Sequence, residues 1–150
     1  SLTNSKNKNV ISSVRKEVIV FDDNKWILKT DEQLVQKWKD LKESLIELND
    51  VELVSKKDYI SLMFGNKTIC FFNLQKNKIR MDFNRGNIKT DGTISKNFFT
   101  LDDPKEISIE GSWEWKDGTK GNVYKISLNK NFDVDYVKFL IKQKYNSFLK

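Results

Sequence analysis

Histidine and alanine are absent from this sequence of 150 residues, and cysteine and proline occur once each. Without histidine, the chain cannot perform Ser-His-Asp or Cys-His catalysis and cannot bind a metal through imidazole. A single cysteine excludes a disulfide within the chain. Hydrophobic residues still make up 38% of the sequence, and because none of them is alanine, nearly all are large enough to fill a core. We therefore expect a globular fold, and disorder of the whole chain is excluded.

Long apolar segments are also lacking. No run approaches the roughly 18 residues needed to cross a bilayer, and the polar start SLTNSKNKN is unlike a signal peptide. Cys70, within TICFF, is typical of a buried thiol in a reducing compartment, so we expect a cytoplasmic protein without membrane contact. Residues 1–9 are expected to be a flexible lead-in and residues 10–150 a single domain. The missing initiator Met and the polar start indicate the C-terminal part of a longer protein, with an N-terminal domain as neighbour.

The first half of the sequence predicts a hairpin and a helix. Residues 17–21 and 25–29 are β-prone runs on either side of a turn at residues 22–24. Thr30 and Gln33 have the spacing of a capping box, which predicts a helix start at Thr30. The helix that follows, over residues 31–48, has one apolar stripe, formed by Leu34, Trp38, Leu41, Leu45 and Leu48.

The second half predicts a meander of strands and a closing helix. Residues 59–64 and 67–74 are joined by a Gly65-Asn66 turn, and residues 78–83 follow as a strand with one apolar face. The run 67–74 is apolar on both faces, so we expect a central strand covered on both sides. The remaining expectations are a mobile loop over 84–100, a helix start at 102–104, a strand over 123–128 and a helix over 133–148. Together these elements predict an α+β fold, with a mainly antiparallel sheet of four to six strands flanked by two amphipathic helices.

Positive charge is concentrated in the middle of the chain. The formal net charge is +6, and residues 51–100 carry nine basic groups against four acidic ones, while the other two thirds are nearly balanced. A surface of this kind could follow phosphates, which require positive charge and little special geometry. The alternatives are an ordinary solvated strand face and the codon bias of an AT-rich genome, which enriches Lys. The candidate nucleic-acid-binding residues are Lys76, Lys78, Arg80, Arg85 and Lys89.

A nuclease site is the main catalytic alternative. Asp102 or Asp103, followed by Glu114 and Lys116, imitates the carboxylate and E-x-K pattern that binds Mg²⁺ and activates water. The sequence contains four acid-x-Lys triplets, a number that chance explains in a chain this rich in Lys. No phosphate-binding glycine loop, dinucleotide motif or C-x-x-C pair is present. We therefore predict no catalytic residue, no metal site and no cofactor.

Trp113 and Trp115 are two positions apart, so in an extended chain both side chains point the same way. Such a pair could stack a nucleobase or dock a partner protein. The simpler interpretation is a pair that closes over the edge of the core. The sequence leaves these three possibilities open.

In order along the chain, residues 58–146 resemble a bacterial and archaeal family, an uncharacterised C-terminal domain sometimes labelled a predicted transport protein. The matching stretches are DYISLMFGNKTICFFNLQKNKIRMDF, LDDPKEIS and DVDYVKFLIKQKY. The last stretch is similar to the closing helix of that family, with Tyr136, Val137, Leu140, Ile141, Gln143 and Tyr145 in place. The family usually has a glycine-histidine-tryptophan-glycine stretch. Here Gly111 and Trp113 are retained, while Ser112 and Glu114 replace the histidine and the second glycine.

The family domain often follows restriction-like or other DNA-related modules, so the resemblance implies an accessory role in DNA processing or defence. Together with the basic middle third, it predicts a non-catalytic accessory domain of a bacterial restriction, defence or DNA-processing protein that contacts DNA or RNA. The first alternative is a protein–protein docking module without a nucleic-acid role. The remote alternative is the Mg²⁺-dependent nuclease.

Overall fold

The computed structural model describes residues 22–96 and 98–150, so the lead-in over residues 1–9 and the strand expected over residues 17–21 lie outside the described residues. The helices and strands, in chain order, are α2 (Asn24–Ile27), α3 (Glu32–Leu45), β2 (Val51–Ser55), β3 (Ile60–Phe64), β4 (Lys67–Leu74), β5 (Ile79–Ile88), β6 (Ser108–Glu114), β7 (Lys120–Leu128) and α4 (Val134–Phe148).

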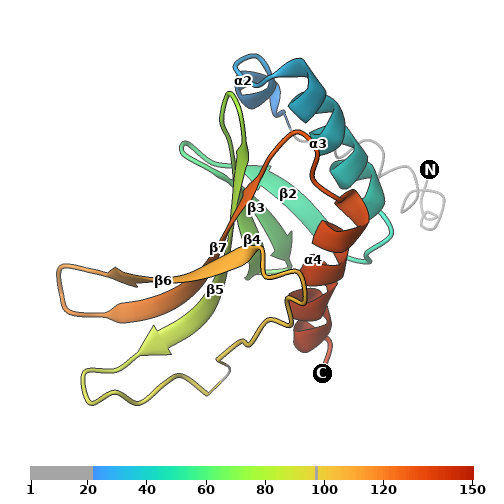
Figure 1. Cartoon of the computed structure of the whole chain (residues 1–150). Helices are drawn as coiled ribbons and strands as arrows, with labels where there is room; N and C mark the ends of the chain where they lie inside the picture. Colours follow the sequence, from blue (N-terminus) through green and yellow to red (C-terminus); the bar gives the residue numbers. More distant parts are fainter. Residues whose placement is uncertain (1–21, 97) are drawn as a thin grey trace.

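The described strands form one six-stranded antiparallel sheet in the order β2-β3-β4-β5-β7-β6, and the fold is α+β as the sequence predicted. In Figure 1, α3 and α4 lie against one face of the sheet, while β5, β6 and β7 extend beyond the helices as a projecting arm. The opposite face of the sheet is covered by none of the described helices. We call it the open face.

The core lies between the two long helices and the sheet. All five residues of the predicted α3 stripe are buried, and Trp38 meets Phe72 of β4 edge to face, with ring centroids 5.1 Å apart. From α4, the hydroxyl of Tyr145 donates to the carbonyl of Asn49, 3.0 Å away. The sequence offers Asn131 or Asp133 as the cap of α4, and the structure has Asp133, whose carboxylate accepts from the amide of Tyr136. These contacts close the helical layer over one side of the sheet.

The meander is confirmed. Gly65 has the positive φ (62°) expected for the turn between β3 and β4, and β4 is the third of six strands. The expectation that β4 is covered on both sides is wrong. Phe72 and Leu74 are buried against the helices, but the alternate residue Phe71 is only half-buried, on the open face.

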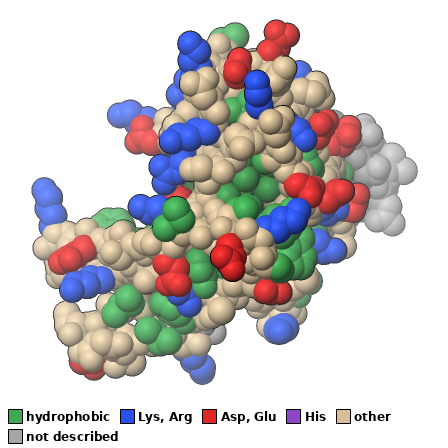
Figure 2. Space-filling view, viewed as in Figure 1, with side chains coloured by type: hydrophobic (Ala, Val, Ile, Leu, Met, Phe, Trp, Pro, Cys, Tyr) green, Lys and Arg blue, Asp and Glu red, His purple; other side chains and the backbone are tan. Residues whose placement is uncertain are grey.

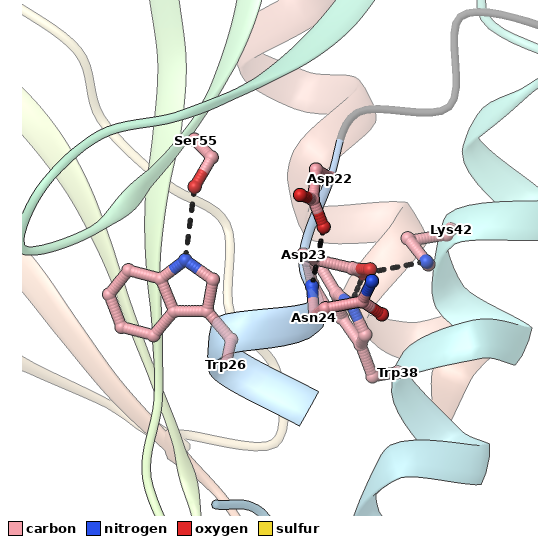
Figure 3. Close-up of polar contacts among 7 residues, drawn as sticks. All are labelled: Asp22, Asp23, Asn24, Trp26, Trp38, Lys42 and Ser55. Carbon is pink, nitrogen blue, oxygen red and sulfur yellow. Dashed lines mark hydrogen bonds and ion pairs between the residues drawn. The ribbon is translucent and has the colours of Figure 1, made fainter. Parts of the chain in front are cut away.

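The strand predicted over residues 25–29 is wrong, because residues 24–27 form the one-turn helix α2. Tertiary contacts decide this conformation. Trp26 is buried and donates from Nε1 to Oγ of Ser55, 3.1 Å away. The buried carboxylate of Asp23 accepts from Nε1 of Trp38 at 2.8 Å and pairs with Lys42 at 2.7 Å (Figure 3). These bonds fix the segment to α3 and to the end of β2.

The start of α3 also differs from the prediction. Asp31 is the N-cap residue, and Thr30 instead donates its hydroxyl to the carbonyl of Trp26, 2.7 Å away. α3 ends at Leu45, and a turn carries the chain on to Asp50. Leu48 is therefore buried together with the stripe, although it lies beyond the end of the helix.

Two further expectations for the second half are wrong. The loop expected over residues 84–100 begins only after Ile88, because β5 remains paired with β7 up to Ile88. The helix expected at residues 102–104 is a turn. The carboxylate of Asp103 accepts from the amide and the hydroxyl of Ser108, both at 2.8 Å, and from the hydroxyl of Tyr136, so it ties the start of β6 to α4.

Candidate nucleic-acid interface

The open face presents two rows of side chains that cross the sheet. Strand register places Phe71 opposite Asp82 and Asp82 opposite Lys125, from β4 through β5 to β7. The neighbouring row runs from Asn73 through Arg80 to Ser127. Side chains alternate between the two faces of a strand, so the core residues between these positions point to the helices.

A hollow of about 310 Å³ lies where the two rows begin. It is lined by Tyr59, Phe71, Phe72, Asn73, Arg80 and Asp82. The rings of Tyr59 and Phe71 meet edge to face, with centroids 5.0 Å apart, and form its apolar wall. Nδ2 of Asn73 donates to the carbonyl of Asp58 at 3.0 Å, which holds the β2–β3 loop beside the hollow.

Asp82 is the one acid that lines this hollow. Its Oδ1 atom is buried and accepts no hydrogen bond from the described residues, while its side chain as a whole is 36% exposed. The nearest cation is Nη2 of Arg80, 4.0 Å from Oδ1, which is beyond hydrogen-bond length. Burial raises the pKa of Asp82 above its ordinary value, and the positive charges of Arg80 and Lys125 oppose this rise.

Three of the five predicted basic residues lie together at one end of the sheet. Lys76 is exposed in the turn between β4 and β5, Lys78 is exposed just before β5, and Arg80 follows on the open face. Lys56 and Lys57, in the β2–β3 loop, are exposed at the same end of the strands. Figure 2 shows Lys and Arg side chains along the left margin of the molecule, on the side away from α3 and α4.

Arg85 does not join this group. Arg85 lies five residues after Arg80, so strand alternation points its side chain to the other face, where only 14% of it is exposed. Its guanidinium donates to Glu110 at 2.8 Å and to the carbonyl of Phe99 at 2.9 Å. The guanidinium also lies over the ring of Tyr124, 4.6 Å from the centroid. These contacts assign Arg85 a structural role in fixing the loop that follows β5.

Lys89 is exposed just beyond the other end of β5. A strand of ten residues spans roughly 30 Å, so Lys89 and Lys76 lie far apart. The predicted basic stretch is therefore continuous in sequence but not in space.

The two tryptophans lie near the tip of the arm. Their rings are in contact, with centroids 6.3 Å apart and nearly perpendicular planes. Trp113 lies over Gly121 of β7 and donates from Nε1 to Oδ1 of Asn84 at 3.2 Å. Trp115 is 66% exposed. Of the pair, Trp115 has the larger surface available for stacking or docking.

The residues of the nuclease alternative are separated. Asp103 is bound at the start of β6 and Glu114 ends that strand, about 20 Å away for seven residues of extended chain. Within the described part of the chain, no group of three acidic or cysteine side chains is arranged to hold a metal ion. Cys70 is fully buried, and burial raises the pKa of its thiol, so the residue is an inert part of the core.

Sequence reasoning missed Tyr59, Phe71 and Lys125. The signal was present in the strand alternation, because Phe71 and Asn73 share one side of β4 and the short turn at residues 75–78 fixes Asn73 opposite Arg80. The prediction that both faces of β4 are covered placed Phe71 in the core, because residues 69–72 (ICFF) include no polar side chain. Lys125 lies outside the basic middle third, and only the pairing of β5 with β7 brings it to Asp82.

The fold and this surface define the class of the molecule as a small α+β domain with an open basic and aromatic sheet face. Comparison of the chain with known protein families, curated proteins and solved structures finds no match. Among the described residues, no helix has the length and apolar character needed to cross a membrane.

Proposed function

We propose that this chain is a non-catalytic accessory domain of a bacterial restriction, defence or DNA-processing protein, and that it contacts nucleic acid through the open face of its sheet. The observation that carries the proposal is the combination of exposed basic side chains with an aromatic hollow on the face opposite the helices. The resemblance of residues 58–146 to a domain that follows DNA-related modules supports the biological setting.

The chemistry of the open face suits a flexible polyanion. Lys78, Arg80 and Lys125 supply positive charge along the sheet, and Lys76 extends it into the adjoining turn. Phosphate contacts of this kind give affinity without sequence information. Of the predicted residues, Lys76, Lys78 and Arg80 belong to this surface, whereas Arg85 has a structural role and Lys89 lies outside it.

The proposal is tested by fluorescence anisotropy with labelled single-stranded and duplex oligonucleotides at several salt concentrations. Reversal of two charges in the variant Lys78→Glu/Arg80→Glu should weaken binding to all sequences and reduce the salt slope by about 0.7 per lost phosphate contact on a single strand. The matched control is Lys39→Glu/Lys142→Glu, since both lysines are exposed on helices. Equal effects of the two variants, or no binding at low salt, would refute the proposal.

A second candidate function is docking of a partner protein, such as a neighbouring domain of the same polypeptide. It is favoured by the exposure of two apolar side chains on β6 and just beyond it, since Ile109 is 72% and Trp115 is 66% exposed. Trp115→Ser should then abolish partner binding, while the Lys78→Glu/Arg80→Glu variant should retain it. The two functions are thus separated by opposite responses of the same two variants.

A further inference from the structure

We propose that the hollow on the open face receives one unpaired guanine base of a single-stranded nucleic acid, with Asp82 as the hydrogen-bond acceptor for its Watson–Crick edge. This inference rests on the proposed function, because it names the class of ligand that the same face binds.

The size and shape of the hollow fit one base. Its volume of about 310 Å³ lies at the lower end of the range of small-molecule sites, which starts near 300 Å³. It is a shallow depression in a sheet, so a base must leave its stack to enter it. Single strands supply such bases without the cost of unpairing a duplex.

The wall of the hollow provides an apolar surface for the base. Tyr59 and Phe71 are both half-buried, so each ring keeps a part of its surface exposed while their edge-to-face contact fixes their orientation. Aromatic side chains on open sheets stack bases, and this contact tolerates any base because each has a π face. The aromatic pair therefore accounts for binding of a base and not for its identity.

Asp82 supplies the discrimination. An ionised carboxylate only accepts hydrogen bonds. Oδ1 of Asp82 has no donor among the described residues but is itself buried, whereas the side chain as a whole is 36% exposed, so a base would first meet the exposed part of the carboxylate. Guanine is the one common base with two adjacent donors, N1–H and the N2 amino group, on its Watson–Crick edge. Adenine and cytosine each place a ring-nitrogen acceptor beside their amino donor, and thymine and uracil flank their single donor with two carbonyls. A carboxylate facing any of these four bases would meet a second acceptor.

Arg80 and Lys125 flank Asp82 and carry the charge that the backbone of the strand requires. Lys125 lies opposite Asp82 in the register of the sheet, and Arg80 lies two residues before it on the same face. The separation of 4.0 Å between Nη2 of Arg80 and Oδ1 of Asp82 leaves this pair of atoms without a mutual hydrogen bond. Base edge and phosphate can thus be bound by adjacent side chains at the same time.

The test uses four labelled oligothymidylates of equal length that carry G, A, C or T at the central position, so that their phosphates are identical. We expect the G oligonucleotide to bind at least five-fold more tightly than the other three in anisotropy titrations. Asp82→Asn should remove this preference while binding of the T oligonucleotide stays equal or becomes tighter, because a negative charge is lost. Asp40→Asn, which removes a carboxylate from the exposed side of α3, should keep the preference.

Two further experiments separate a failure of the guanine inference from a failure of the proposed function. Phe71→Leu should weaken all four oligonucleotides and preserve their order, which tests the hollow even if Asp82→Asn fails to fold. GMP should compete with the G oligonucleotide better than CMP does. If GMP competes only at concentrations far above that of the oligonucleotide, the additional affinity of the oligonucleotide comes from its backbone contacts. Equal binding of the four oligonucleotides would overturn the guanine inference and leave the proposed function intact. Absence of binding by all of them would overturn both.

Discussion

Phe71 of β4 lies directly opposite Asp82 of β5 on the open face of the sheet. The pair places a half-buried aromatic ring beside a carboxylate that lacks a hydrogen-bond donor for one of its oxygens. In a purely structural sheet, this pairing is unfavourable, because the partly buried charge loses solvation that Arg80 and Lys125 compensate only in part. Residues that cost stability in this way are expected where a ligand supplies the missing partner.

Replacement of Asp82 by Asn should increase stability at neutral pH. The folded state raises the pKa of Asp82, so it binds more protons than the unfolded chain between the ordinary pKa and the raised one, and stability falls as the pH rises through this window. The Asn side chain does not titrate, so the Asp82→Asn variant does not lose stability as the pH rises through this window. Urea denaturation followed by circular dichroism should show a higher midpoint for Asp82→Asn at pH 7 and a difference that shrinks as the pH is lowered toward the ordinary pKa of 3.8. A lower midpoint at pH 7 would contradict the account.

Lys144 should make the protein more stable as the pH rises from 7.5 to 9.5. Its side chain is buried, its ammonium donates to the carbonyl of Asn84, and burial lowers its pKa to about 8. Between this value and the ordinary pKa of 10.5, the unfolded chain holds a proton that the folded chain has released. Stability therefore increases with pH there, by about 2 kcal/mol over this range.

The comparison for this prediction is Lys144→Met, which keeps the length of the buried chain and removes the charge. Its free energy of unfolding should be nearly independent of pH between 7.5 and 9.5. Parallel profiles for the variant and the original chain would show that another group is responsible.

Gly121→Ala should destabilise the arm through a clash with Trp113. A Cβ atom at Gly121 would lie 1.9 Å from Cζ2 of Trp113, so the ring or the strand must move. We expect a loss of about 1–3 kcal/mol, as for other overpacked sites. The combination with Trp113→Leu should recover part of that loss, and thermal denaturation of the three variants measures it. A double variant whose loss equals the sum of the two single losses would show that the clash is absent.

Arg85 and Arg80 should differ in what their removal changes. Arg85→Ala leaves Glu110 and the carbonyl of Phe99 without their charged donor and should cost about 1.5–3 kcal/mol of stability. Arg80→Ala should cost much less, since Arg80 is one third exposed and its ion pair is long. Oligonucleotide affinity at 10 °C, where both variants remain folded, should fall for Arg80→Ala and stay nearly unchanged for Arg85→Ala. The reverse order would refute these roles.

Strong periodicity made much of the fold predictable. The apolar stripes of α3 and α4, the Gly65 turn and the alternation of β5 were visible because each repeats over several turns or residues. The strands β2 and β6 were missed because they are the two outer strands of the sheet that the described residues form, where each pairs with one described neighbour and the pattern is weak. The segment at Trp26 has β-prone residues, yet its contact with Ser55 and the bonds of Asp23 make it helical.

The candidate site was only partly predictable, for a related reason. The sequence predicts which face of β5 is covered, but it predicts a loop over residues 84–100, where faces cannot be assigned. The basic residues were therefore grouped by their nearness in sequence, which joined Arg85 and Lys89 to Arg80. In the structure β5 continues to Ile88, so alternation places Arg85 on the face opposite Arg80, and the pairing of β5 with β7 brings Lys125 to the open face.

The most direct test of the open face as a nucleic-acid surface is a titration of the ¹⁵N-labelled protein with an unlabelled G-containing oligothymidylate, followed by amide chemical shifts. We expect little change along α3 and α4 and the largest changes at five residues of the open face: Phe71, Asn73, Arg80, Asp82 and Lys125. Changes centred on Trp115 and the tip of the arm, or on the helices, would contradict it.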